Sequence, residues 1–269
     1  MTHHIFKHIG HMPITDVKAV DLKKPLELIE LQGKNDTAST ARQICGQIFR
    51  YAIAAGYTET NPADALIGAL SPVVVKNRPH ISGKDNIADL MRRIRGYNSF
   101  VVQRAMLFSA YTFQRPGEVR HAEWKEIDFD AALWRIPAPK MKMKREHLAP
   151  LARQSIELLR EIQELTGDGQ YIFPSVRAPK GDRPMSDATV LVALRSIGYS
   201  NDEMTAHGFR GMASTQLNEQ GYNRDVIELC LAHAENNSVR AAYNHAERLD
   251  DRRSMCQDWA DWLDGLNAD

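Results

Sequence analysis

Apolar residues recur at helical spacing over most of the chain, beginning with the segment that ends near Leu70. The clearest case is residues 37–56, which end in Gly56, a residue suited to the left-handed conformation that terminates helices. Asn61 and Pro62 predict the start of a short helix, because proline fits the first helical position. The helix in residues 37–56 is expected to use an apolar face made of Ile44, Ile48, Tyr51 and Ala55.

The helical period returns beyond residue 80 and is interrupted by one stretch of alternating and clustered apolar residues. Short strands are expected in that stretch at residues 127–129, 133–136 and 147–151. Helices are expected at residues 82–94, 99–112, 154–165, 186–197, 205–219, 223–232 and 238–249, with a short one beginning at Pro116. Their predicted N-caps include Ser82, Ser186, Asn223 and Ser238. The sequence therefore predicts a mainly α fold with one small antiparallel β-sheet.

A segment punctuated by proline separates the two helical blocks. Residues 71–79 contain Pro72 and Pro79 around three adjacent valines, which is typical of a linker between domains. We therefore expect one domain at residues 1–75 and a second at residues 80–269.

The composition is that of an ordinary globular protein, with 43% hydrophobic and 25% charged residues. No apolar run approaches the length that spans a bilayer, and the first residues lack the apolar core of a secretory signal. Cys45, Cys230 and Cys256 are widely spaced, which argues against a zinc site and a disulfide framework. We expect a cytoplasmic protein without a membrane partner.

A net charge of zero weighs against a simple nucleic-acid-binding domain, which usually carries a basic surplus. The charge is unevenly distributed, however. Residues 244–269 hold seven acidic and three basic side chains, so the rest of the chain has 31 Lys and Arg against 27 Asp and Glu. The mildly basic charge of residues 1–243 is compatible with DNA binding but does not demonstrate it.

Three short patterns contain the side chains that suggest chemistry. The first is Thr-Phe-Gln-Arg-Pro-Gly-Glu at residues 112–118, and the second is His-Gly-Phe-Arg at residues 207–210. The third is Leu-Ala-His at residues 231–233, followed ten residues later by Tyr243. A basic segment, residues 140–151, lies between the first and the second and is expected to form a hairpin of the small sheet.

In this order the patterns resemble the active-site residues of the tyrosine recombinases, and most closely the phage integrases of the P4 type. The family has an arginine, a lysine, a His-x-x-Arg pair, a histidine or tryptophan, and a tyrosine, in that sequence. Each pattern alone is common on ordinary protein surfaces, but the ordered combination is specific. The matching positions here are Arg115, Lys142, His207, Arg210, His233 and Tyr243.

The resemblance extends over nearly the whole chain. Residues 10–14, 49–53 and 61–63 are similar to the core-binding domain of that subgroup, and residues 258–262 to its C-terminal helix. It implies a helical, SAM-like core-binding domain followed by a catalytic domain. P4-type integrases also begin with an arm-binding domain, so the chain is expected to correspond to an N-terminally truncated form. Ala232 stands where the family usually has glycine, and we expect this added methyl group to have little consequence.

Elementary chemistry agrees with the implied roles of the arginines. A pentacovalent phosphate transition state gathers negative charge on its nonbridging oxygens, and Arg115 and Arg210 offer planar forks of permanently charged donors. Glu118 is expected to support the helix that bears Arg115. The resemblance implies that His207 accepts the proton of Tyr243, and that His233 hydrogen-bonds the phosphate.

The leaving 5′ oxygen needs a proton donor, and the resemblance assigns that role to Lys142. Lys140 and Lys144 have the same expected strand parity and remain alternatives. Lys140, Lys144 and Arg145 are expected to bind DNA, whereas Met141 and Met143 are expected to contact the core. Neither a metal nor a nucleotide cofactor is implied, because arginines supply the charge and the phosphotyrosine conserves the bond energy.

The implied partner is a double-stranded DNA attachment site, bound between the two domains. The protein is expected to be a monomer when free and a homotetramer on synapsed DNA, acting with an excisionase or a DNA-bending host protein. Trp259, Trp262 and Leu266 form an apolar stripe expected to dock on a neighbouring protomer, or in cis in the free monomer. Two other functions stay open: a relative that binds DNA without recombining it, and a type IB topoisomerase.

Overall fold

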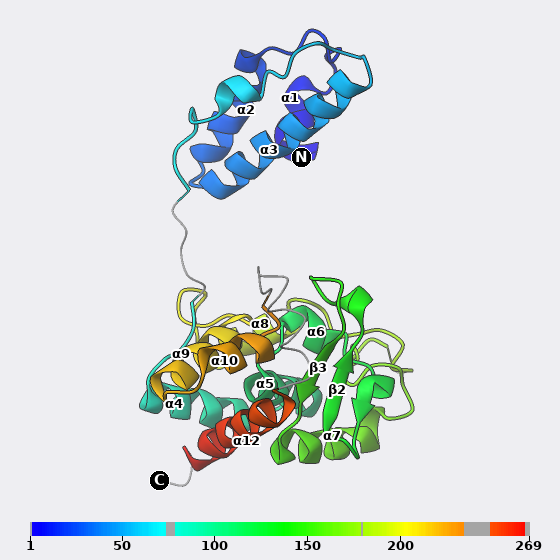
Figure 1. Ribbon diagram of the computed structural model, residues 1–269, viewed down its shortest axis with the longest axis vertical. Helices are drawn as coiled ribbons and strands as arrows, with labels where there is room; N and C mark the ends of the chain where they lie inside the picture. Colours follow the sequence, from blue (N-terminus) through cyan, green and yellow to red (C-terminus); the bar gives the residue numbers. More distant parts are fainter. Residues whose placement is uncertain (1, 74–78, 179, 234–247, 267–269) are drawn as a thin grey trace. The chain divides into compact units, whose positions relative to one another are not determined.

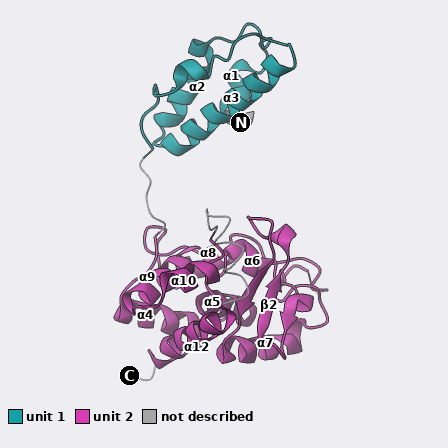
Figure 2. Ribbon diagram, viewed as in Figure 1, with its two compact units in different colours: residues 1–77 teal, residues 78–269 magenta. Residues whose placement is uncertain are grey.

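The computed structural model describes residues 2–73, 79–178, 180–233 and 248–266. The chain forms two compact units, residues Met1–Asn77 and Arg78–Asp269 (Figure 2). Each unit has its own cluster of buried apolar side chains, so each is described by itself.

The first unit is helical. A π-helical turn at Thr2–Phe6 leads into α1 (Lys7–Ile9), and the two longer helices are α2 (Ala19–Glu30) and α3 (Asn35–Ala54). The short helix expected after Asn61 is the 3₁₀ turn Asp64–Leu66. Gly56 has φ 75°, and it ends α3 in the left-handed conformation expected of it.

The buried face of α3 differs from the expected one. Ile48 and Tyr51 are exposed, whereas Cys45 and Phe49 are buried in the cluster that α3 shares with α2. Small residues such as Ala38 allow the two helices to approach closely. The period therefore predicted the helix correctly, but Ile48 and Tyr51 did not mark its packed face.

The second unit is mainly helical, as predicted. Its helices are α4 (Lys84–Arg95), α5 (Phe100–Thr112), α6 (Pro116–Arg120), α7 (Arg153–Thr166), α8 (Thr189–Ser196), α9 (Gly208–Glu219), α10 (Arg224–Cys230) and α12 (Leu249–Gly265). Asn223 caps α10 through its side chain, which accepts a hydrogen bond from the Asp225 backbone, but Gly83 rather than Ser82 precedes α4. The predicted helix at residues 238–249 lies almost entirely outside the described residues. Among the described helices of both units, none is both long and apolar enough to cross a membrane.

The predicted sheet is present and has three strands in the order β1-β2-β3. The strands are β1 (Ile127–Asp128), β2 (Leu133–Ile136) and β3 (His147–Pro150). Both pairs are antiparallel, with Asp128 opposite Leu133 and Ile136 opposite His147. The connection from β2 to β3 is therefore a ten-residue loop, residues 137–146, that begins with the 3₁₀ turn Ala138–Lys140.

Helix α5 forms the centre of the second unit (Figure 1). Every residue from Ala105 to Thr112 is buried, because α5 contacts helices on several sides, among them α4, α7, α9 and α12. A helix that is apolar all round is stable only when other elements surround it. The C-terminal end of α5 consequently places residues 113–115 deep in the molecule, next to α9 and α10.

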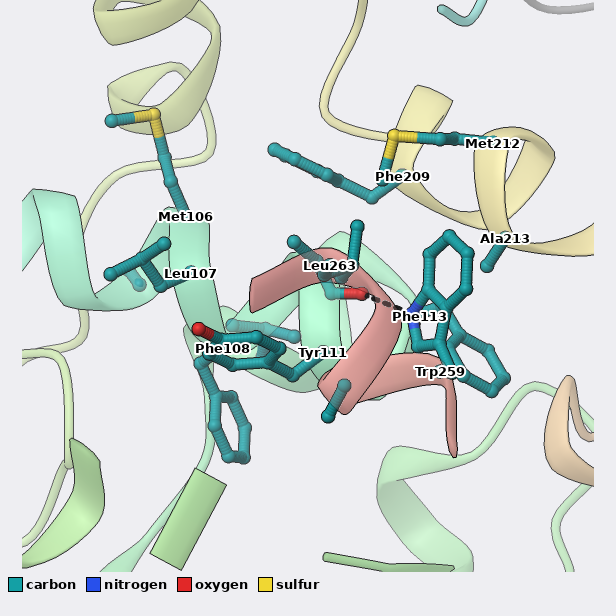
Figure 3. Close-up of a cluster of buried hydrophobic side chains, with 14 of the residues drawn as sticks. Met106, Leu107, Phe108, Tyr111, Phe113, Phe209, Met212, Ala213, Trp259 and Leu263 are labelled. Atoms are coloured by element: carbon teal, nitrogen blue, oxygen red, sulfur yellow. Dashed lines mark hydrogen bonds between the residues drawn. The ribbon is translucent and has the colours of Figure 1, made fainter. Parts of the chain in front are cut away.

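Helix α12 packs against α5 within the same chain. The Trp259 side chain is fully buried, and its indole N–H donates to the Ala110 carbonyl over 2.9 Å (Figure 3). Trp262 stacks on Trp259 with ring centroids 5.3 Å apart, and Leu266 is also buried. The apolar stripe therefore packs within its own chain, which is one of the two arrangements expected from the sequence.

Helices α10 and α12 also contact each other through sulfur. Cys230 and Cys256 are free buried thiols whose Sγ atoms lie 3.9 Å apart. The hydrogen bond with Cys256 lowers the pKa of Cys230 despite its burial. The C-terminal end of α10 is therefore packed against the middle of α12.

Candidate active site

The C-terminus of α10 has a backbone geometry that arranges the groups around it. The N–H of His233 donates to the Glu228 carbonyl over 3.1 Å, and the N–H of Ala232 donates to the Leu229 carbonyl over 3.1 Å. These two bonds constitute a Schellman motif, which requires a left-handed residue at its turn. Ala232 occupies that position with φ 48°.

The conformation of Ala232 corrects one expectation. A left-handed conformation strains any residue with a Cβ atom by about 1 kcal/mol, whereas glycine adopts it freely. The alanine at this position therefore has a backbone cost, contrary to the expectation that its methyl group matters little. The motif persists because the tertiary contacts described next hold its carbonyl groups.

Three side chains from distant parts of the sequence bind successive carbonyls at the end of α10. Gln114 Nε2 donates to the Cys230 carbonyl over 3.0 Å. Arg210 donates to the Leu231 carbonyl over 2.6 Å, and Arg115 donates to the Ala232 carbonyl over 2.9 Å. The last carbonyls of a helix lack intrahelical partners and carry partial negative charge, so guanidinium groups suit them. The helix end thus brings two of the sequence-predicted arginines together.

Glu118 fixes Arg115 at two points. One carboxylate oxygen accepts the Arg115 backbone N–H over 2.9 Å, and the other accepts a guanidinium N–H over 2.8 Å. Helix α6 begins at Pro116, directly after Arg115, so Glu118 lies one helical turn after Arg115. Glu118 is 3% exposed and Arg115 is 18% exposed at the side chain, so water competes little with this pair.

Arg210 is the most enclosed of the sequence-predicted catalytic residues that the structure describes. Its side chain is buried, and one terminal nitrogen donates to the Phe113 carbonyl over 2.9 Å. The other donates to the Leu231 carbonyl and lies 3.1 Å from His233 Nε2. Arg210 therefore connects the end of α5 with the end of α10.

His207 precedes α9 rather than lying within it. It is the N-cap residue and is half-buried, so it shares the first turn of α9 with Arg210. The next residue, Gly208, allows the backbone at Pro79 to approach this turn closely, because a Cβ atom at residue 208 would lie 2.9 Å from the Pro79 carbonyl oxygen. The segment that enters the second unit thereby contacts the start of α9 directly.

His233 has one partner on each side of its ring. Nδ1 lies 2.6 Å from a carboxylate oxygen of Glu228, and Nε2 lies 3.1 Å from Arg210. The side chain is 46% exposed. The described site therefore contains a chain of contacts from Glu228 through His233 to Arg210.

The loop between β2 and β3 carries the candidate lysine. Lys142 is exposed, and residues 141–146 form turns rather than the expected strand hairpin, so strand parity does not relate Lys142 to its neighbours. Met141 is buried as expected, whereas Met143 is exposed. Lys144 and Arg145 are also exposed, and Lys144 donates to the Pro139 carbonyl over 3.2 Å.

Lys140 differs from its two basic neighbours because it forms ion pairs inside the unit. Its ammonium group contacts Glu123 Oε1 over 2.6 Å, and it also binds Glu126 and the His121 carbonyl. Burial of Glu123 acts to raise its pKa, but hydrogen bonds from Lys125 and Lys140 outweigh this and bring the pKa to about 2. The contacts of Lys140 are those of a structural residue, and its binding of DNA stays a prediction.

Replacement of Lys140 by alanine should therefore destabilise the second unit. The change leaves the nearly buried carboxylates of Glu123 and Glu126 without their shared cation, and we expect a loss of about 2 kcal/mol in the free energy of unfolding, measured with urea. The matched change Lys144→Ala should cost under about 0.5 kcal/mol, because Lys144 is exposed. The contribution of Glu123 requires its ionised form, so the difference should disappear as the pH falls from about 4 toward 2. Equal stability of the two variants at neutral pH would contradict this role.

Tyr243 and the surrounding residues 234–247 lie outside the described residues. The structure accordingly describes five of the six sequence-predicted catalytic positions, and brings Arg115, Arg210 and His233 together around one helix end.

Two residues at this helix end were missed by the sequence analysis. Gln114 was part of the first pattern but received no role, and Glu228 was not considered. The available signal for Glu228 was its position five residues before His233, near the expected end of a helix. That spacing matches the first and last residues of a Schellman motif.

The comparisons with known proteins agree with this architecture. The model described as the phage integrase family matches residues 83–249, and the one described as the phage integrase central domain matches residues 1–69. The integrase of Enterobacteria phage P4 is 40% identical over 97% of this chain and 62% of that protein. The prophage integrase IntA of Escherichia coli K12 is 37% identical over 98% of this chain and 63% of that protein. The chain thus spans less than two thirds of the length of these two relatives.

A third relative, the putative protein IntB of Escherichia coli K12, is 36% identical over 97% of this chain and 69% of that protein. Among solved structures, a lambda integrase dimer bound to a COC′ core site has a TM-score of 0.67 at 21% identity, over 91% of this chain and 70% of that one. A lambda integrase tetramer bound to a Holliday junction also has a TM-score of 0.67 at 21% identity, over 88% of this chain and 70% of that one. At this level of identity the structural likeness concerns the fold.

Proposed function

Because this chain belongs to the phage integrase family of tyrosine recombinases, we propose that it cleaves and rejoins double-stranded DNA at a specific site. The reaction proceeds through a covalent 3′-phosphotyrosine intermediate and integrates or excises a prophage or a genomic island. The observation that carries the proposal is the convergence of Arg115, Arg210 and His233 at the end of α10.

The two arginines suit the charge of the reaction. Attack on a phosphodiester increases the negative charge on the nonbridging oxygens, and donors placed in advance stabilise that charge most effectively. Arg115 and Arg210 are anchored by backbone carbonyls and, for Arg115, by Glu118. Their guanidinium groups therefore need little reorganisation when a phosphate arrives, and they can hold its oxygens without a metal ion.

The proton movements involve the remaining residues. The ordinary pKa of tyrosine is about 10, so Tyr243 must lose its proton as it attacks, and His207 at the start of α9 accepts it. His233 hydrogen-bonds the phosphate from the end of α10. Lys142, on the exposed loop before β3, protonates the leaving 5′ oxygen, while Lys144 and Arg145 contact the DNA backbone.

The role of Lys142 can be separated from simple charge stabilisation. Lys142→Ala should slow cleavage about 10²- to 10⁴-fold, the usual value of general acid catalysis. A substrate with sulfur in place of the bridging 5′ oxygen should largely remove this defect, because a thiolate leaves without a proton. The measurement is the single-turnover rate of adduct formation on the two substrates.

Matched variants make this test specific. Arg115→Ala and Arg210→Ala should stay slow on the sulfur substrate, since these arginines act on nonbridging oxygens. Rescue of Lys144→Ala instead of Lys142→Ala would assign the proton to the other lysine. Rescue of neither would move the acid to a histidine.

The substrate and the assembly follow from the same proposal. The two predicted domains, residues 1–75 and 80–269, bind a DNA attachment site as core-binding and catalytic domains. The lambda integrase structures contain a dimer on a core site and a tetramer on a Holliday junction, which supports a tetramer of this protein on synapsed DNA. An excisionase or a DNA-bending host protein would set the direction of recombination.

The direct test of the proposed function uses a suicide substrate that contains the attachment core of the element that encodes the chain. A covalent protein–DNA adduct on a denaturing gel is the expected result. DNA binding without any adduct would instead identify a relative that binds but does not recombine. Relaxation of supercoiled DNA without site preference would identify a topoisomerase.

A further inference from the structure

Among the described residues, Glu228 provides the only carboxylate that contacts His233. The fold of the chain at the end of α10 creates that contact. The Schellman motif at the end of α10 joins the His233 N–H to the Glu228 carbonyl, which stacks the two residues on one side of the turn. A hydrophobic contact usually accompanies this motif. Here a carboxylate–imidazole contact of 2.6 Å takes its place.

The partners of His233 define its hydrogen-bonding state. A carboxylate only accepts, so Nδ1 must carry the hydrogen that binds Glu228. A guanidinium group only donates, so Nε2 must accept from Arg210 with its lone pair. An imidazole between these two partners is therefore the neutral Nδ1–H tautomer. The ring can adopt two orientations that differ by a half-turn about the Cβ–Cγ bond, and these contacts fit only one of them.

We propose that Glu228 is a positioning residue, whose carboxylate selects the ring orientation of His233 that directs Nε2 toward Arg210 and the phosphate site. Because a phosphate oxygen only accepts hydrogen bonds, Nε2 must gain a proton before it can donate to a bound phosphate, and the Nδ1–H bond to Glu228 is kept in the resulting imidazolium. The inference rests on the proposed function for the identity of the ligand, a DNA phosphate. Without Glu228 the ring can turn over and present Nδ1 in place of Nε2. The arrangement resembles the general case in which a carboxylate orients a ligand-binding imidazole.

A purely structural role for this contact is disfavoured by its exposure. The side chains of His233 and Glu228 are 46% and 41% exposed, and at such exposure even a fully charged pair contributes little to stability. Glu228 also lies in the last turn of α10, where a negative charge is unfavourable with respect to the helix dipole. Removal of its carboxylate should consequently leave the fold intact, which makes substitution informative.

The tautomer of His233 provides a test that needs no activity. Two-bond proton–nitrogen correlation spectra of the ¹⁵N-labelled chain report which ring nitrogen carries hydrogen, and His233→Gln assigns the signal by its loss. At mildly alkaline pH the wild type should show the Nδ1–H form. Glu228→Ala should shift the signal toward Nε2–H, whereas Glu228→Gln should retain Nδ1–H because its amide oxygen still accepts.

A matched control removes a carboxylate that contacts neither histidine nor arginine among the described residues. Glu219, the exposed last residue of α9, serves this purpose, and Glu219→Ala should leave the His233 signal unchanged. An Nε2–H form in the wild type, or an unchanged tautomer in Glu228→Ala, would overturn the proposal.

The same variants link the tautomer to the reaction. Glu228→Ala should slow adduct formation on the suicide substrate about 10- to 100-fold, the range found for residues that orient an imidazole ligand. Glu228→Gln should recover most of that rate, and Glu219→Ala should match the wild type. A full adduct rate in Glu228→Ala, with the tautomer shifted, would refute the positioning role. If the wild type forms no adduct, the proposed function fails, and the spectra still decide the role of Glu228.

Discussion

Replacement of Tyr243 by phenylalanine is expected to abolish the covalent protein–DNA adduct while leaving DNA binding unchanged. The substitution removes only the oxygen that would attack phosphorus, and a phenyl ring offers no other nucleophile. The arginines at the end of α10 still bind the phosphate in this variant, because their anchors are backbone carbonyls and Glu118. A denaturing gel measures the adduct, and a mobility-shift titration measures binding.

Tyr222→Phe is the matched control, since it removes the same atom elsewhere in the second unit. The Tyr222 hydroxyl donates to Asp258 over 2.9 Å, so its loss should cost at most about 1 kcal/mol of stability and leave the adduct intact. Any residual adduct in Tyr243→Phe would assign the nucleophile to another residue. Loss of DNA binding in that variant would mean that Tyr243 acts in binding as well.

Replacement of Trp259 by alanine should have the largest effect on stability, about 3 to 5 kcal/mol in the free energy of unfolding. The indole is fully buried between α12 and α5, and its removal leaves a cavity and an unpaired Ala110 carbonyl (Figure 3). Deletion of the chain from Leu249 onward should unfold the second unit for the same reason. Urea denaturation of the second unit measures the first effect.

Trp262→Ala provides the comparison, because Trp262 is only partly buried and packs on the outer side of Trp259. We expect it to cost less than half as much as Trp259→Ala. Similar losses for the two variants would contradict the packing described for α12. A wild-type stability of Trp259→Ala would mean that the indole occupies a neighbouring protomer in solution.

The fold was largely predictable because periodicity reports burial directly. The alternating stretch predicted the three strands, and the helical period predicted α4, α5, α7 and α10 to within a few residues. The packed face of α3 was not predictable in the same way. Its small residues, Ala38 and Ala41, are buried through close approach to α2, which depends on the partner helix and leaves no strong apolar signal.

The order of the sequence patterns predicted which residues belong to the candidate site, but it did not predict their contacts. Arg115, Arg210 and His233 follow from the order of the patterns, since each residue type suits phosphate chemistry. Their anchors at carbonyls of α5 and α10 carry no sequence signal, because every residue has a carbonyl group. The partners of Arg210 at Phe113 and Leu231 arise only when α5, α9 and α10 pack together.

Lys140 illustrates a different failure. Strand parity grouped it with Lys142 and Lys144, but β2 ends at Ile136 and the 3₁₀ turn Ala138–Lys140 in the following loop interrupts the alternation. Its side chain then points back to Glu123 and Glu126 rather than outward. A proline at residue 139, the second position of that turn, was the signal available in the sequence.

One turn of α10 holds Gln114, Arg115 and Arg210 together. Local unfolding of that turn therefore releases all three side chains from it cooperatively. A short helix end opens at a lower free energy than the core of a domain. When that turn opens, the Cys230, Leu231 and Ala232 carbonyls leave their partners together, and both guanidinium groups lose their carbonyl partners on α10 in a single event. The arginines are thus organised or disorganised as a pair, so thermal fluctuations affect the fraction of competent molecules rather than the strength of each individual contact.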